Sequence, residues 1–375
     1  MALNPQTTAT LRVPRGLVKV NGAVLAAWTT WSVDNNSFFS ADTFRVSFAL
    51  SKLDDQHSAD WFSQQKDLEV EILAGFPRDP ANPQDAEMTS LIVGQVDAVD
   101  LNMASRAIEL TGRDLSAHFI DNKTAPGAYR NQTASDVAKM LAEKYGLKAE
   151  VSSTTTKVGT YWDQDHIGLT DQRSEWDVLT YLASQEGFIV YVRGHTLHFG
   201  PSPFQAPPTE FYELTWDDTE PVHRFNGKQV AFSRALTVAK GVVVTASSYQ
   251  TKNKRAITSA YPKASKGIGV GRATAVGGTV QNYRLRLPPN KSVLEVEKAA
   301  KRRYDEIVAH EMKLSTTLPA DHYLDIGTAL KVSGTGTAFD QVYYPDSIVR
   351  TMSMDSGYLM EVQAKNVAPE TTPNL

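Results

Sequence analysis

The sequence contains no cysteine, and this absence excludes several kinds of chemistry. Without a thiol the chain cannot form disulfides, use a thiolate nucleophile or bind a metal through sulfur. Long apolar runs are also missing: Gly241-Val242-Val243-Val244 is far shorter than the ~20 residues of a membrane-spanning helix. The N-terminus from Met1 to Thr7 has no basic start followed by an apolar run, so it predicts no signal peptide. We therefore expect the chain to stay in a cytoplasm and not to insert into a membrane.

The chain also has little excess charge of either sign. Its 38 Lys+Arg and 42 Asp+Glu leave a net charge of -4, which argues against a dedicated nucleic-acid-binding domain. A local patch stays open, because net charge averages over the whole surface. The length of 375 residues exceeds the roughly 250–300 residues at which single cores stop growing, so we expect several small domains.

The first feature along the chain is a series of short strand patterns over residues 1–112. Asn21-Gly22 between two apolar stretches is a strong hairpin signal. Residues 44–48 and 68–73 alternate apolar and polar side chains, as half-buried strands do. Strands at such regular spacing predict a small β-barrel module, closed within residues 1–112 or completed by strands near 200–230.

Residues 113–200 change character and contain two similar helix patterns. In the first, Thr133 and Asp136 form a capping box; in the second, 41 residues later, Ser174 and Asp177 do the same. The acidic residues also lie favourably at the positive end of the helix dipole. The glycines that suit the left-handed residue closing each helix are Gly146 and Gly187.

Each predicted helix has one apolar face and is followed by a strand. These faces are expected to consist of Val137, Met140 and Leu141 in the first helix, and Val178, Leu179 and Leu182 in the second. The sequence therefore predicts an α+β module with two capped helices.

After a proline-containing linker, strand patterns return. Residues 201–260 and 315–367 predict a second β-barrel module, interrupted by a loop-plus-helix insertion at 261–314. The segment 250–282, rich in Lys, Gly, Ser and Thr, predicts a mobile surface loop. A helix is expected from about Ser292 to Met312, with an inner face formed by Val293, Val296, Ala300, Tyr304, Ile307 and Val308. Residues 368–375 are expected to be frayed. The predicted fold class is α+β multidomain, with two related antiparallel β-barrel modules and α+β modules attached.

Four segments in this order resemble one known family. They are residues 94–99, residues 110–115, the first capped helix with its lead-in at 129–137, and the second at 174–183 followed by Gly187-Phe188. On these segments the chain is similar to the bacteriophage baseplate hub family, also called late control protein D or Mu-type tail protein P. That family is related to the hub half of the type VI secretion spike protein. The resemblance covers most of the chain.

The resemblance implies a homotrimer in which each subunit supplies two related barrels. Three subunits would form a ring that adapts a sixfold tail tube to a threefold central spike. The ring would leave a channel for the tape-measure protein or DNA, without specific DNA binding. The expected partners are further copies of the chain, a separate spike protein, tail-tube or distal tail proteins and other baseplate subunits. The expected location is the virion tail baseplate, after assembly in the host bacterial cytoplasm.

Motifs that would indicate catalysis or metal binding are weaker than the family resemblance. His310-Glu311 begins like a zincin helix, but Leu314 stands where the second histidine is needed, and an exposed helix end accounts for the pair better. The acidic and histidine cluster around residues 163–166 favours a solvated loop over a metal site; it consists of Asp163, Asp165 and His166.

Two further segments could bind phosphates but favour a simpler interpretation. The glycine-rich run from Gly267 to Gly271 lacks the Lys-Ser/Thr of a phosphate-binding loop and favours a flexible loop. Sparse aromatic residues favour a solvated loop over a nucleic-acid contact for a basic run formed by Lys252, Lys254, Arg255, Lys263, Lys266 and Arg272. Core or interface anchors are the better interpretation of the six tryptophans, Trp28, Trp31, Trp61, Trp162, Trp176 and Trp216.

We therefore expect a structural hub with no catalytic residue, cofactor or metal. Two alternatives stay open. One is the hub of a non-phage contractile injection system of the type VI kind. The other is a tail-associated cell-wall hydrolase, which is disfavoured because the duplicated modules leave no spare block of roughly 120 residues for a catalytic domain.

Overall fold

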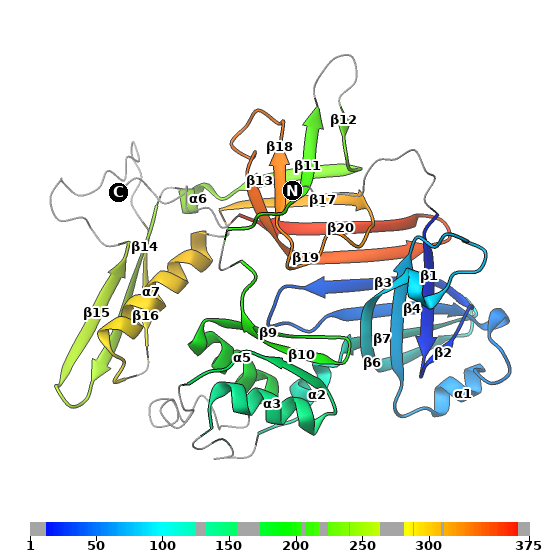
Figure 1. The fold of residues 1–375 in the computed structure, drawn as a ribbon, viewed down its shortest axis with the longest axis horizontal. Coiled ribbons are helices and arrows are strands. Elements are labelled where there is room, and N and C mark those ends of the chain that lie inside the picture. Colours follow the sequence, from blue (N-terminus) through cyan, green and yellow to red (C-terminus); the bar gives the residue numbers. More distant parts are fainter. Residues whose placement is uncertain are drawn as a thin grey trace.

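The computed structural model describes residues 13–124, 129, 132–155, 173–204, 207–217, 224–239, 241–262, 281–287, 289–308 and 311–366. Mostly antiparallel sheets with a few helices make up an α+β fold, as the sequence predicts (Figure 1). Most strands belong to one 14-stranded sheet, and two separate three-stranded sheets carry the helical parts. None of the helices among the described residues is long and apolar enough to span a bilayer.

The N-terminal strand set forms one half of the large sheet. Alternating burial along these strands, for example in Arg15–Val20, places one row of side chains in the core and the other towards solvent. The strands are β1 (Arg15–Val20), β2 (Ala23–Val24), β3 (Trp28–Asn36), β4 (Thr43–Ala49), β5 (Glu69–Gly75), β6 (Met88–Asn102) and β7 (Ala107–Asp114). Short helices lie between them, namely η1 (Leu50–Lys52), α1 (Ala59–Gln64) and η2 (Asp85–Glu87).

The C-terminal strand set forms the other half. Its strands are β11 (Tyr212–Asp217), β12 (Arg224–Phe225), β13 (Gln229–Arg234), β17 (Met312–Pro319), β18 (Leu330–Ser333), β19 (Val342–Ser353) and β20 (Gly357–Lys365). Of the strands near 200–230, β11 pairs with β18 and β12. They therefore belong to this set, and the prediction that they could complete the first module is wrong.

The two strand sets share one connectivity. In the N-terminal set the neighbours run β3-β4-β7-β6-β5-β1; in the C-terminal set they run β13-β17-β20-β19-β18-β11. When the two-residue strands β2 and β12 are left out and the others are numbered along the chain within each set, both orders read second, third, sixth, fifth, fourth, first. One pairing differs in direction, because β1 runs antiparallel to β5 whereas β11 runs parallel to β18. The halves are thus two related β modules, joined where β3 pairs with β19.

The α+β module packs beside this sheet. It comprises α2 (Ala117–Asp121), α3 (Ala134–Lys144), β8 (Lys148–Val151), α5 (Glu175–Glu186), β9 (Phe188–Arg193) and β10 (Thr196–Pro201). Its two capped helices share a core of their own with the module's strands. Met140 is an exception to the predicted apolar face, since it is 36% exposed. The module is tied to the C-terminal strand set by Arg193, whose Nη1 lies 2.6 Å from an Asp325 carboxylate oxygen.

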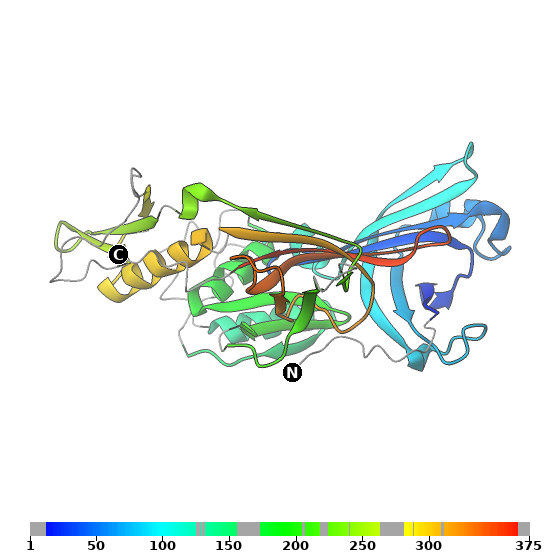
Figure 2. The same cartoon turned by 90° about the horizontal axis from the view of Figure 1, so that it is seen from above.

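The insertion module (residues 241–308) interrupts the C-terminal strand set and projects at one end of the molecule (Figures 1 and 2). It follows the short helix α6 (Leu236–Ala239) and contains β14 (Val242–Gln250), β15 (Arg255–Tyr261), β16 (Gln281–Arg286) and α7 (Val293–Val308). α7 packs on β14 and β15 around a third small core.

Four predictions for this region are wrong. The insertion starts near residue 241 and not at 261, because β14 and β15 form a separate sheet with β16. The segment 250–282 is not all loop, because β15 pairs with β14 along seven residue pairs and β16 starts at Gln281. The helix ends at Val308, not near Met312, which begins β17. Val293 is 54% exposed because it is the first residue of α7 and lies outside the inner face.

Candidate functional site

The junction of the two strand sets is the candidate functional site, because it fixes how the two related modules sit relative to each other. β3 and β19 pair antiparallel along seven residue pairs, from Asn36 opposite Ser347 to Thr30 opposite Ser353. Trp31 pairs with Met352 at this seam, and its side chain is buried. Residues of both sets belong to one hydrophobic core, so the seam is continuous with the interior.

A buried polar chain crosses this seam. Arg350 on β19 is 4% exposed, and its Nη1 donates to Asn35 Oδ1 on β3 at 2.9 Å. The Arg350 guanidinium also donates to the backbone carbonyls of Asp321 and Leu324. Buried polar groups need such partners, because an unpaired one loses its hydration without compensation.

The chain continues into the N-terminal strand set through two aspartates. Asn35 Nδ2 donates to Asp42 Oδ2 at 2.9 Å, and the backbone N–H of Asp42 donates to Asp114 Oδ2 at 3.1 Å. Burial, together with the nearby Asp114 carboxylate, raises the pKa of Asp42 to about 7. Burial likewise raises the pKa of Asp114 to about 6, although hydrogen bonds from Ser116 oppose the shift. The polar chain therefore contains two carboxyl groups whose pKa values lie above the usual value for aspartate.

These raised values predict a pH dependence of stability. Between about pH 4 and pH 7 the folded chain keeps protons that the unfolded chain releases, so the free energy of unfolding falls as the pH rises. Replacing Asp114 with Asn removes one of the two charges. Between pH 5 and pH 8, the free energy of unfolding of the Asp114→Asn variant is expected to fall by about 2 kcal/mol less than that of the wild type.

Urea unfolding of both proteins at the two pH values measures this difference. All other side chains are shared, so the difference in slope reports the carboxyl pair alone. Equal pH slopes for the two proteins would refute the coupling between Asp42 and Asp114.

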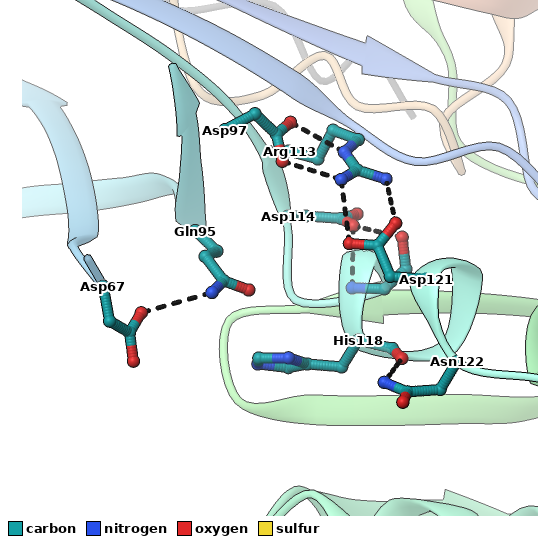
Figure 3. Close-up of polar contacts among 9 residues, drawn as sticks. Asp67, Gln95, Asp97, Arg113, Asp114, His118, Asp121 and Asn122 are labelled. Atoms are coloured by element: carbon teal, nitrogen blue, oxygen red, sulfur yellow. Dashed lines mark hydrogen bonds and ion pairs between the residues drawn. The ribbon is translucent and has the colours of Figure 1, made fainter. Parts of the chain in front are cut away.

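Arg113, the residue before Asp114 on β7, forms a second polar cluster, shown in Figure 3. Its Nε and Nη2 donate to the two carboxylate oxygens of Asp97, each at 2.7 Å, and Nη1 and Nη2 reach Asp121 on α2 at 3.2 and 3.1 Å. Asp97 is the extra residue of a β-bulge in β6, since Val96 and Ala98 pair with adjacent residues of β7. The cluster joins the N-terminal strand set to the α+β module.

The C-terminal strand set repeats this arrangement. Asp346 is the extra residue of a bulge in β19, and its carboxylate lies 2.7 Å from Lys365 Nζ on β20. In strand order, Asp346 and Lys365 take the places of Asp97 and Arg113. The two related modules thus share a bulge, an aspartate and a basic partner.

A further pair of contacts is repeated in both strand sets, at the residue after Arg113 and at the residue after Lys365. Asp114 accepts from Asp42 N and donates its own N–H to Asp42 O. Asn366 does the same with Met312: its Oδ1 accepts from Met312 N at 2.8 Å and its N–H donates to Met312 O. Both clamps fix the chain where it enters the third strand of its set, β4 or β17.

The predicted helix caps lie away from the seam, within the α+β module. Both capping boxes are present: Thr133 Oγ1 accepts from Asp136 N at 3.2 Å, and Ser174 Oγ accepts from Asp177 N at 3.0 Å. Gly187 is the left-handed C-cap of α5 with φ +73°, whereas Gly146, with φ +68°, follows the C-cap residue Tyr145. These residues hold helices in place and form no common site.

The other candidate motifs are scattered. Glu311 is not at an exposed helix end: it is 1% exposed and its carboxylate lies 2.7 Å from Arg234 Nη2 at the base of the insertion module. His310, the cluster at 163–166 and the glycine-rich run at 267–271 lie outside the described residues, as do Lys263, Lys266 and Arg272. Within the described ranges, no three His, Cys, Asp or Glu side chains are grouped to hold a metal ion.

Sequence reasoning missed the functional residues at the seam. It used the segments that contain Asp97 and Arg113 but did not predict that these two residues form an ion pair. It did not single out Asn35, Asp42 or Arg350. The available signal was faint: an aspartate inside each long strand pattern, followed by a strand that ends in Arg-Asp or Lys-Asn.

Comparison with solved structures supplies the context for this architecture. A tail protein from Neisseria meningitidis MC58 superimposes with a TM-score of 0.67 at 16% identity, covering 96% of this chain and 99% of that protein. The 43 kDa tail protein of prophage MuSo2 from Shewanella oneidensis gives 0.68 at 14% identity, covering 94% and 98%. The chain has the fold of these tail proteins.

The tail-protein fold also extends to secretion systems. An E. coli protein that is a component of the type VI secretion system gives a TM-score of 0.52 at 11% identity, covering 92% of this chain and 76% of that protein. No protein-family model matches the sequence, and no curated protein matches it. The likeness therefore rests on the fold.

Proposed function

We propose that the chain is the hub of a phage tail baseplate, a trimeric ring that adapts a sixfold tail tube to a threefold spike. The observation that carries this proposal is the repeated connectivity of the two strand sets, with the matched bulges at Asp97 and Asp346. Three copies of a chain with two related modules present six similar strand sets. A ring of this kind meets sixfold and threefold neighbours with the same subunits.

The proposed partners follow from this role. They are two further copies of the chain, a separate spike protein, tail-tube or distal tail proteins and other baseplate subunits. The ring leaves a channel for the tape-measure protein or DNA. Assembly takes place in the host cytoplasm, and the finished ring resides in the virion. The likeness to phage tail proteins over nearly their whole length supports this location.

The solution mass tests the proposal. Light scattering of the purified chain at micromolar concentration is expected to give three times the 41.2 kDa mass of one chain. A stable dimer, or a monomer that stays monomeric after addition of the cognate spike protein, would contradict a trimeric hub.

The hub needs no catalysis, only matched surfaces. The structures it resembles are tail and secretion-system proteins, which supports a structural role. A zymogram on cell-wall material is expected to show no clearing, and a cleared band at the mass of the chain would favour the hydrolase alternative.

A second candidate is the hub of a non-phage contractile injection system. The likeness to the E. coli type VI secretion component favours it. Mass spectrometry of tailed particles purified from the producing bacterium separates the two: a phage hub is found in particles that contain DNA, and an injection-system hub in particles without it.

A further inference from the structure

The insertion module carries a charge opposite to that of the remaining chain. Its described residues, 241–262, 281–287 and 289–308, include ten Lys or Arg and four Asp or Glu. The other parts of the chain hold the remaining 28 basic and 38 acidic residues. A chain with a small net charge thus consists of a basic projection on an acidic body.

Within the module, the ion pairs of the acidic residues are made with basic residues on or beside α7 and not with those of the sheet. Glu295 pairs with Lys291, Asp305 with Lys301 and Glu306 with Arg303, all on or beside α7. The basic residues of the sheet are all exposed, and none of them has an ion-pair partner among the described residues; they are Lys252, Lys254, Arg255, Arg284 and Arg286.

These five residues gather at one end and on one face of the three-stranded sheet. Lys252 and Lys254 lie in the β14–β15 turn, and Arg255 follows it. Arg284 and Arg286 are opposite Thr245 and Ser247, which alternate with the β14 residues buried against α7. They therefore lie on the sheet face that α7 leaves uncovered.

The opposite end of the molecule is acidic. Residues 50–69, which include α1, contain two lysines and five exposed carboxylates: Asp54, Asp55, Asp60, Asp67 and Glu69. A groove runs between α1 and β6 beside them, and its lining includes Asp67, Lys66, Leu101 and Asp97, the last of which is paired with Arg113. Leu101 is 44% exposed, so the groove has an apolar wall as well as carboxylates.

Figures 1 and 2 place the insertion module and α1 at opposite ends of the long axis. A basic turn cannot reach an acidic groove of its own chain across that distance. In a ring built from one repeated contact, the front of each subunit meets the back of the next.

We infer that the β14–β15 turn of one copy docks into the α1–β6 groove of the next copy and holds the ring closed head to tail. This inference rests on the proposed trimer and names its contact. A second copy fits better than nucleic acid, because the same chain supplies the complementary carboxylates.

Charge reversal on each side tests the contact. We expect the double variant Lys252→Glu/Lys254→Glu to weaken trimer formation at least tenfold at physiological salt, measured by sedimentation over a concentration series. Asp60→Lys/Asp67→Lys on the other side is expected to act alike. Combining all four changes in one chain is expected to restore the trimer, because each reversed turn then meets a reversed groove.

A matched control changes the same charge elsewhere. Lys139→Glu/Lys298→Glu reverses two exposed lysines on α3 and α7 and is expected to shift the trimer by less than twofold. Circular dichroism melting of every variant separates loss of contact from loss of folding, because none of these four lysines is buried.

The outcomes separate the inference from the proposed function. A wild type that forms no trimer overturns the hub proposal, and the inference with it. A trimer that resists both reversals overturns the inference alone. Binding of duplex DNA by the wild type that the turn variant loses, with the trimer unchanged, would reassign the turn to nucleic acid and also overturn the inference.

Discussion

Replacing Arg350 with Leu is expected to lower the free energy of unfolding by about 4 kcal/mol. The change leaves three buried acceptors without their donor: Asn35 Oδ1 and the carbonyls of Asp321 and Leu324. It also removes the positive charge from the neighbourhood of Asp321, which is itself buried. Urea unfolding at pH 7 measures the loss.

Arg45 provides the matched control for Arg350. It also lies on a strand of the large sheet, but its side chain is 62% exposed and pairs with Glu109 at 3.5 Å. Exposed pairs of this kind contribute little, so Arg45→Leu is expected to cost less than about 1 kcal/mol. If the two variants were equally stable, the hydrogen bonds of Arg350 across the seam would not contribute more to stability than an exposed ion pair does.

Trp31→Ala is expected to destabilise the protein by about 4 kcal/mol, since truncation leaves a large cavity in a close-packed interior. The indole is 1% exposed and lies 5.7 Å, ring to ring, from Tyr358. Its Nε1 lies so near Gly16 that a Cβ placed there would be 2.7 Å away, which indicates how closely the indole and β1 approach. Trp31 therefore fills the space where the two strand sets meet.

The conservative variant Trp31→Phe separates volume from polarity. It keeps a ring and removes an indole N–H that has no hydrogen-bond partner among the described residues. We expect a cost below about 2 kcal/mol, clearly less than for Ala. Thermal and urea unfolding give both values, and a Phe variant as unstable as the Ala variant would contradict the packing argument.

Local patterns predicted the parts of this fold that depend on local rules. Alternation in Phe44–Phe48 predicted a strand because one side of the sheet is buried, and Thr133 with Asp136 predicted a helix start because the capping box acts within four residues. By contrast, β15 was missed because Ile257 is its one large aliphatic residue, and its position depends on pairing with β14.

The seam could not be predicted for a similar reason. β3 and β19 are separated by some 300 residues of sequence, and nothing in either strand specifies the other. Arg350 lies within a strand pattern that reads like any half-buried strand, and its partner Asn35 is 315 positions away. Asp97 and Asp346 take equivalent places only when the pairing registers are known, because the segments around them differ in sequence.

The most direct test of the central claim is single-particle electron microscopy of the assembled chain. The account predicts a closed ring with true threefold symmetry and strong sixfold modulation at the radius of the sheets. That modulation arises because each subunit contributes both strand sets side by side. A twofold assembly, an open filament, or a threefold ring in which only one of the two strand sets faces the channel would contradict it.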